Sequence, residues 1–249
     1  MQKSITENGK TGFHDKQILE SWQKNVSPWV DAIQHKQIES RVLVTDKAII
    51  ETVISLSGNN APDNNASGKS VLDIGCGEGW LTRALITSGL SVTGIDAVQG
   101  LVDKAKALGE GDFHVLEYEQ FSDRTIPQQY DIAVCNFSLI GNESVEHLFS
   151  VLPSILNKGG TFIIQTLNPY ISCGDAPYVD GWREGSWNGF SHDFCDPAPW
   201  YFRTIASWLQ LFINNGFVLK AFKEPIDSST GKPASLILVG KVVSSPVDG

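Results

Sequence analysis

Residues 71–79, Val-Leu-Asp-Ile-Gly-Cys-Gly-Glu-Gly, have the composition of a loop that holds a nucleotide cofactor. The apolar start of this segment predicts a buried strand, and its alternating glycines permit a tight turn in which the backbone approaches a ligand closely. Helical spacing follows over 80–88, and Gly89 is placed to end that helix. The sequence therefore predicts that a strand, a glycine turn and a helix form one side of a site.

The charge of this loop indicates which cofactor it suits. The dinucleotide motif Gly-x-Gly-x-x-Gly surrounds a pyrophosphate and needs a third glycine where this chain has Trp80. Asp73 and Glu78 place two carboxylates where phosphates would lie, and like charges repel each other. S-adenosylmethionine carries an ammonium and a sulfonium and has no phosphate, so we expect it to be the cofactor.

A second acidic residue is placed to hold a ribose. Residues 91–96 read as a strand that ends in Asp96, 17 residues after Gly79, close to where a ribose-binding carboxylate belongs. Its two oxygens are able to accept hydrogen bonds from both ribose hydroxyls.

Three strings, VLDIGCGEGWLTRAL at 71–85, VTGIDA at 92–97 and YDIAVCNFSLI at 130–140, resemble motifs of the class I S-adenosylmethionine-dependent methyltransferase family. The resemblance covers about residues 70–165. It implies that the glycine loop carries the methionine part, that the acid after the second strand holds the ribose, and that residues after the third strand flank the adenine. The cofactor contacts expected on this basis are Asp73, Gly75, Cys76, Gly77, Asp96, Ala97, Tyr118, Glu119 and Asn136.

The N-terminal segment is similar to that of methyltransferases of the ubiquinone-biosynthesis O-methyltransferase type, in Trp22, Trp29, the string Ile-Glu-Ser-Arg at 38–41 and the Thr-Asp pair at 45–46. The resemblance implies helices that fold over the cofactor as a lid. An arginine in such a lid pairs with the methionine carboxylate through a bidentate fork, and Arg41 is the candidate. The alternative is that Arg41 is a solvent-facing helix residue.

Composition limits the class of partner. The chain has 249 residues, a formal net charge of −9 and a pI near 5.0, which disfavours nucleic acid because phosphate binding needs clustered Lys and Arg. Its four cysteines show no Cys-x-x-Cys pairing, which favours a reducing compartment and predicts no metal site. The N-terminus has no apolar signal core, and no run of 18 apolar residues occurs, so we expect a cytoplasmic protein without membrane contact. The oligomeric state is left open.

Strands that alternate with helices predict one α/β domain, a doubly wound and mostly parallel sheet. The resemblance implies seven strands, the last of them antiparallel. Expected strands are 71–74, 91–96, 113–116, 131–137, 161–167, 217–223 and 235–242. Expected helices are 18–26, one capped by Ser27 with Pro28 in its first turn, one capped by Thr45, 80–88, 101–108, 145–156 closed by Lys158-Gly-Gly, and 200–214.

The expected parts of domain 1–249 are an N-terminal helical lid over 1–57, a flexible connector over 57–69, a cofactor-binding core over 70–167, a substrate cap over 168–202, and a C-terminal helix with closing strands over 203–249.

Residues 168–202 form the longest irregular stretch and are rich in aromatic side chains. Segments of this length are functional or disordered, and the aromatic content argues against disorder. We expect an aromatic cap over a hydrophobic or ring-bearing substrate; the alternative is a satellite core under a loop.

A late string, Trp-Tyr-Phe-Arg-Thr at 200–204, also resembles the small-molecule enzymes, and its Arg203 is expected to hold the cap or an acidic substrate group, unless it pairs on the surface. The substrate contacts expected are Tyr170, Trp182, Trp187, Phe190, Trp200 and Arg203.

A phenol-like acceptor, with a pKa of about 10, benefits from a general base. His192 next to Asp193 is the candidate pair, although a histidine in a polar loop is more often structural. We therefore expect methyl transfer to a small, aromatic or apolar acceptor at oxygen, by in-line displacement. The alternatives are a protein or peptide methyltransferase that takes basic peptides, a cofactor-binding module without catalysis, and, more distantly, a dehydrogenase.

Overall fold

The computed structural model describes residues 13–58, 68–126 and 128–243, and its centre is a seven-stranded sheet with the order β3-β2-β1-β4-β5-β11-β8. The strands are β1 Ser70–Ile74, β2 Ser91–Asp96, β3 Asp112–Val115, β4 Tyr130–Asn136, β5 Leu156–Thr166, β8 Phe217–Lys223 and β11 Leu236–Val242. β1 to β5 pair in parallel, and β11 is antiparallel to both β5 and β8. The predicted doubly wound, mostly parallel sheet with an antiparallel last strand is confirmed.

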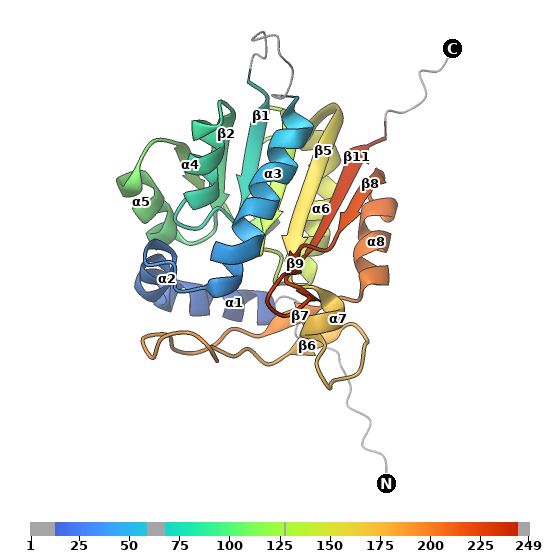
Figure 1. Ribbon diagram of the computed structural model, residues 1–249. Coiled ribbons are helices and arrows are strands. Elements are labelled where there is room, and N and C mark those ends of the chain that lie inside the picture. The colour runs from blue at the N-terminus through green and yellow to red at the C-terminus, as the bar shows by residue number, and fades with distance from the viewer. Residues whose placement is uncertain (1–12, 59–67, 127, 244–249) are drawn as a thin grey trace, which may run out of the picture.

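Helices cover both faces of this sheet (Figure 1). They are α1 Phe13–Lys24, α2 Val26–Gln34, the π-helical turn η1 Arg41–Thr45, α3 Asp46–Ser57, α4 Trp80–Thr87, α5 Gln99–Leu108, the 3₁₀ turn η2 Tyr118–Gln120, α6 Glu143–Ile155, α7 Pro169–Ser172 and α8 Ile205–Asn214. Two small hairpins complete the chain, β6 Gly181–Arg183 with β7 Trp200–Phe202, and β9 Ile226–Asp227 with β10 Lys232–Pro233. None of the helices in the described part of the chain has the length and apolarity needed to cross a bilayer.

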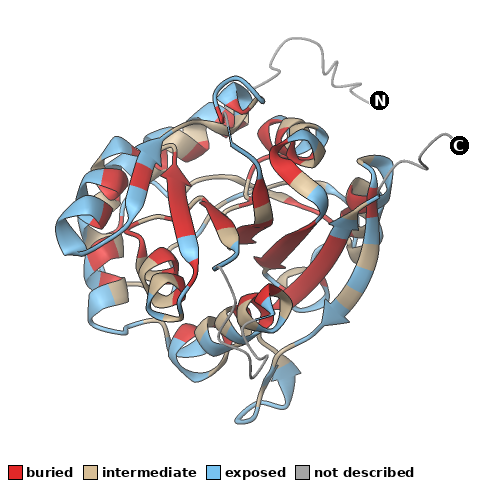
Figure 2. Ribbon diagram, turned by 90° about the horizontal axis from the view of Figure 1, so that it is seen from above, coloured by how far each residue is buried: buried red, intermediate tan, exposed pale blue. Residues whose placement is uncertain are grey.

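The central strands are apolar on both faces because helices pack on each side. Val71 of β1 joins a cluster with Ile49 and Val53 of α3 and with residues of α4, whereas Leu72 and Ile74 point the other way, into a cluster with α6 and α8. Seen from above, the central strands are buried along most of their length, whereas the outer helix faces are exposed (Figure 2). Alternation along each strand thus builds two cores from one sheet.

The sheet topology places a crevice at the carboxyl ends of β1 and β4. The chain runs from β1 outward to β2 and β3, and then returns to the other side of β1 as β4. Connections leave in opposite directions at this switch point, and ligands of open α/β sheets bind there. α1, α2 and the β6–β7 segment lie across this end of the sheet (Figure 1).

Several predicted element boundaries were wrong. α2 begins at Val26 with Asn25 at its N-cap, so Ser27 is inside the helix rather than its cap. The helix predicted from 200 begins at Ile205, because residues 200–202 pair with β6 as strand β7. β5 starts directly after α6, at Leu156, so Lys158-Gly-Gly lies in the strand and does not close the helix.

The segment after β5 is more regular than predicted. Asn168 caps the short helix α7 by accepting hydrogen bonds from the amides of Tyr170 and Ile171. The cap predicted over 168–202 therefore contains α7, β6 and β7. Most of the connector predicted over 57–69 lies outside the described residues.

Candidate functional site

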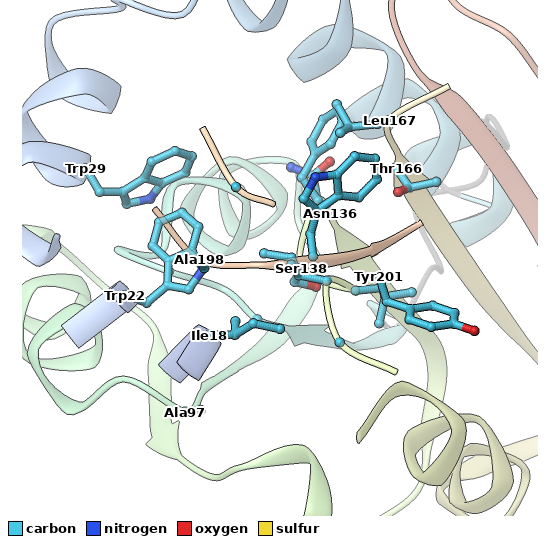
Figure 3. Close-up of a pocket in the computed structure, with 18 of the residues that line it drawn as sticks. Ile18, Trp22, Trp29, Ala97, Asn136, Ser138, Thr166, Leu167, Ala198 and Tyr201 are labelled. Carbon is cyan, nitrogen blue, oxygen red and sulfur yellow. The ribbon is translucent and has the colours of Figure 1, made fainter. Parts of the chain in front are cut away.

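A pocket of about 700 Å³ opens at the switch point of the sheet. Its floor comes from the loops after β1, β2 and β4, and its roof from α1, α2 and the residues around β7. Trp22 and Trp29 lie on one side of it, facing Asn136 and Ser138 (Figure 3). This volume lies within the usual range of small-molecule sites, about 300 to 1,000 Å³.

The glycine loop forms the inner wall of the pocket through its backbone. Gly75 has φ +74°, and a Cβ at that position would overlap the Cβ of Ser138 and lie 2.9 Å from the Tyr118 hydroxyl. Gly77 has φ +58°, and a Cβ there would meet only Trp29 Nε1, at 3.5 Å, on the pocket side. The loop therefore needs glycine at 75 for packing, whereas Gly77 leaves its backbone open to a ligand.

Asp96, at the end of β2, lies against this loop. Its Oδ2 accepts a hydrogen bond from the Gly77 amide at 2.9 Å, and its Oδ1 accepts one from the Val98 amide at 2.9 Å. Burial raises the pKa of this carboxyl, and the two amides oppose that rise. Each carboxylate oxygen keeps a further lone pair, so Asp96, which lines the pocket, is able to accept hydrogen bonds from a ligand diol.

Asp73 was expected among the cofactor contacts, but the structure places it behind the loop and not among the residues that line the pocket. Its Oδ2 accepts a hydrogen bond of 2.7 Å from the Thr82 hydroxyl of α4. Burial raises the pKa of Asp73 to about 7, and the nearby charges of Asp96 and Glu78 add to the rise. Asp73 therefore ties the end of β1 to α4 rather than offering a contact to a ligand in the pocket.

Arg41 and Glu78 bring opposite charges to one wall of the pocket, and each keeps an unused polar atom. The π-helical turn η1 carries Arg41, whose Nε donates to Asp46 at 2.9 Å and whose guanidinium carbon lies 4.5 Å from the centre of the Trp80 ring. Arg83 pairs with Glu78 Oε1 at 3.3 Å. Among the described residues, Arg41 Nη2 and Glu78 Oε2 are buried without a hydrogen-bond partner. This wall offers a free donor on a cation and a free acceptor on an anion, which suits a ligand with both charges.

Burial raises the pKa of the Glu78 carboxyl, and the guanidinium groups of Arg41 and Arg83 oppose that rise. A ligand ammonium near Glu78 would favour its ionised form in the same way.

Ala97, Tyr118, Glu119 and Asn136 also line the pocket, as do Cys76 and the two glycines. Tyr118 belongs to η2, and its hydroxyl donates to the Ser138 carbonyl oxygen at 3.3 Å. Asn136, the last residue of β4, has a buried side-chain oxygen without a partner in the described chain. The structure thus brings together all of the expected cofactor residues except Asp73.

Aromatic side chains of the lid helices and of the cap form the roof of the pocket, and hydrogen bonds join the lid to the cap. Trp22 of α1 makes edge contacts with Trp29 at 5.0 Å and with Trp187 of the cap at 5.7 Å between ring centres. The buried Asn25 side chain donates to the Cys195 carbonyl at 2.8 Å and accepts from the Cys195 amide at 2.9 Å. Lid and cap therefore close over the pocket as one layer.

Four of the expected substrate contacts line the pocket, and two do not. Trp187, Phe190, Trp200 and Arg203 are among the lining residues. Tyr170 is 76% exposed on α7, and the Trp182 ring lies outside the lining, 4.6 Å from His14 and 5.4 Å from Tyr201 between ring centres.

His192 and Asp193, the expected general-base pair, do not reach the pocket. Both residues are exposed, and neither belongs to the lining. Asp193 accepts a hydrogen bond from the Ser191 hydroxyl, whereas the neighbouring Phe194 is buried against Trp187 and the backbone amide of Cys195 donates to Asn25 of the lid. The expectation of a base at His192 therefore has no support in the geometry.

Sequence reasoning missed Asp15 as a residue of the site. It lies on α1, is buried, lines the pocket, and accepts hydrogen bonds from the amides of Asn142 and Ser144 at the start of α6. Asp15 precedes the helix predicted over 18–26, although the observed α1 begins at Phe13, and its partners lie more than a hundred positions away in the chain, so no local signal marked it.

The family model for the methyltransferase domain matches residues 47–221. The ubiquinone biosynthesis O-methyltransferase of Paraburkholderia phymatum is 33% identical over 112 residues, covering 41% of this chain and 46% of that relative. The enzyme of the same name from Rickettsia canadensis is 30% identical over 151 residues, covering 55% of this chain and 61% of the relative. The chain thus spans about half the length of the curated relatives it matches.

Solved structures share the fold at low identity. A S-adenosylmethionine-dependent methyltransferase from Mesorhizobium loti superposes with a TM-score of 0.58 at 21% identity, covering 78% of this chain and 96% of the other. The magnesium protoporphyrin IX methyltransferase from Synechocystis, solved with its bound cofactor, gives 0.52 at 18% identity, covering 95% and 86%. With most of its length matched by the family model, the chain belongs to the methyltransferase domain family and has the class I S-adenosylmethionine-dependent methyltransferase fold.

Proposed function

We propose that this protein transfers a methyl group from S-adenosylmethionine to an oxygen atom of a small, aromatic or apolar acceptor. The observation that carries the proposal is one continuous pocket whose floor is polar and charged and whose roof is aromatic. The names of the curated relatives support oxygen as the acceptor atom.

The residues of the floor fit the charges of this cofactor. The unpaired Nη2 of Arg41 suits the methionine carboxylate, and the unpaired Oε2 of Glu78 suits the ammonium. Asp96 suits the ribose hydroxyls, and Tyr118 and Glu119, which also line the pocket, suit the adenine. When bound, the cofactor supplies a methyl group on a positively charged sulfur, which is a good leaving group.

The protein's own contribution to such a reaction is alignment and the exclusion of water. Trp22, Trp29 and Trp187 close the roof, and the hydrogen bonds between Asn25 and Cys195 hold the cap against the lid. Holding two reactants in line contributes about 7 to 11 kcal/mol to catalysis. No histidine lies among the described residues that line the pocket, so alignment is the main device that we assign to these side chains.

Asp96→Ala tests the cofactor assignment. The loss of charge-assisted hydrogen bonds should weaken S-adenosylmethionine binding by about 1.5 to 3 kcal/mol, measured by isothermal titration calorimetry on folded protein. Asp131→Ala is the matched control, because Asp131 also accepts a backbone amide, that of Ser70, but lies outside the pocket. Normal binding by the Asp96 variant would contradict the ribose assignment.

The nature of the acceptor is tested with S-adenosylmethionine that carries a labelled methyl group. We expect label to appear in small phenols or acids and not in protein or peptide fractions. Label in basic peptides would instead favour a protein methyltransferase, and tight cofactor binding without transfer to any acceptor would favour a binding module.

A further inference from the structure

Arg203, just after β7, is a buried cation at the pocket. It is 4% exposed, and it lines the pocket next to Tyr201. Its Nη1 donates to the Gly141 carbonyl at 2.7 Å, and its Nη2 donates to the carbonyl and side-chain oxygens of Asn142 at 3.0 and 2.9 Å. All of these acceptors are neutral.

No carboxylate in the described part of the chain lies within 4.0 Å of Arg203. The acid on the lid, Asp15, already accepts the amides of Asn142 and Ser144, and Glu146 is exposed. Burial lowers the pKa of Arg203 to about 10, so the guanidinium remains charged at neutral pH. The charges of Glu146, Asp180 and Asp15 offset part of the cost of burying this cation without touching it, and an anion in direct contact would offset more.

The guanidinium keeps donors for such an anion. The guanidinium carbon lies 4.7 Å from the centre of the Tyr201 ring and 5.2 Å from that of Trp208, so aromatic rings stand beside it. A guanidinium has five N–H donors, and the three acceptors above engage three of them. The remaining donors, Nε–H and one Nη1–H, can each give a single hydrogen bond to a carboxylate oxygen, and Leu139, Ile140 and Trp200, which line the same pocket, suit a hydrophobic body.

We propose that the acceptor is an aromatic or apolar molecule with a carboxylate group, and that Arg203 binds this carboxylate. The inference rests on the proposed function, because it assigns an anchor for the acceptor within the same pocket. Arg203 and Arg41 would then bind different molecules. Arg203 would bind the acceptor, whereas Arg41, which forms the charged wall with Glu78, would bind the cofactor.

The test compares carboxylates with neutral molecules of the same shape. Binding of benzoate and 2-naphthoate is measured by calorimetry against benzamide and 2-naphthamide, on the full chain loaded with S-adenosylhomocysteine. We expect the carboxylates to bind about tenfold tighter or more, since hydrogen bonds to charged groups have that strength. Arg203→Met should remove this preference and leave amide binding unchanged.

Arg183→Met is the matched control. Arg183 also lies over an aromatic ring of the cap, 4.8 Å from the centre of Phe202, and donates to the Pro177 carbonyl, but it does not line the pocket. This variant should keep the preference.

Equal binding of acids and amides by the wild-type protein, or no binding of either acid, would overturn the inference, and neither result depends on whether the Arg203 variant folds. A preference that survives in folded Arg203→Met would also overturn it. Binding of S-adenosylhomocysteine, measured first, separates these outcomes from a failure of the proposed function.

Discussion

Gly75→Ala should destabilise the fold more than Gly77→Ala, although both glycines have positive φ in the same loop. An alanine in the left-handed region costs about 1–2 kcal/mol at either position. At 75 the new methyl group would also overlap Ser138, which is fixed because its hydroxyl donates to the Ile74 carbonyl at 2.8 Å, and it would lie 2.9 Å from the Tyr118 hydroxyl. Overpacking of this kind costs about 1–3 kcal/mol more.

The expected losses of unfolding free energy are therefore about 2 to 5 kcal/mol for Gly75→Ala and about 1 to 2 kcal/mol for Gly77→Ala. The second variant has a different defect. Its methyl group would point to the pocket, where Trp29 Nε1 is the nearest atom at 3.5 Å, and we expect it to obstruct the methionine part of the cofactor.

Urea unfolding followed by circular dichroism measures stability, and calorimetry measures S-adenosylmethionine binding. The expected pattern is a Gly75 variant with the larger loss of unfolding free energy and a Gly77 variant with the smaller loss that binds the cofactor weakly. Equal unfolding free energies would refute the steric argument at Gly75. Normal cofactor binding by Gly77→Ala would refute the placement of the methionine part along the loop.

Two further predictions concern His192 and Asp73, whose surroundings in the structure differ from those expected from the sequence. His192→Ala should leave turnover within about twofold of wild type, because a general base must reach the acceptor and His192 is exposed outside the pocket. A loss of about a hundredfold in steady-state assays would instead identify His192 as the base. Asp73→Asn should flatten the pH dependence of the unfolding free energy. The pKa of Asp73 is about 7 in the folded protein and has an ordinary value of 3.8, so the folded state holds the proton more tightly than the unfolded state does. The resulting stabilisation is complete below about pH 4 and is lost as the pH rises through 7. Urea unfolding between pH 5 and 7.5 should show the wild type losing up to about 1.4 kcal/mol per pH unit relative to the variant, and parallel curves would contradict the pKa of Asp73.

The cofactor half of the site was predictable because its signals are local. The run from Val71 to Gly79 contains the strand, the turn and its charge, and Asp96 ends a strand whose bounds were predicted correctly. In a parallel sheet, neighbouring strands end at the same edge, so residues at those ends meet whatever the rest of the chain does.

The acceptor half was only partly predictable because composition does not determine where an irregular segment points. Trp187 and Phe190 line the pocket, whereas Tyr170 and His192 from the same predicted cap are exposed. The hydrogen bonds between Asn25 and the backbone of Cys195, which hold the cap against the lid, join residues 170 positions apart, so no local pattern predicts them.

The sequence by itself determined the alternation of strands and helices, the glycine turn and the acidic residues around it, since periodicity and backbone conformation depend on near neighbours in the chain. Only the tertiary structure decided that Asp15 binds the start of α6, that Asp73 stands behind the loop, and that Arg203 is buried without a carboxylate beside it. These properties arise from burial and from contacts between residues far apart in sequence, and they exist only after the lid and cap have packed on the sheet.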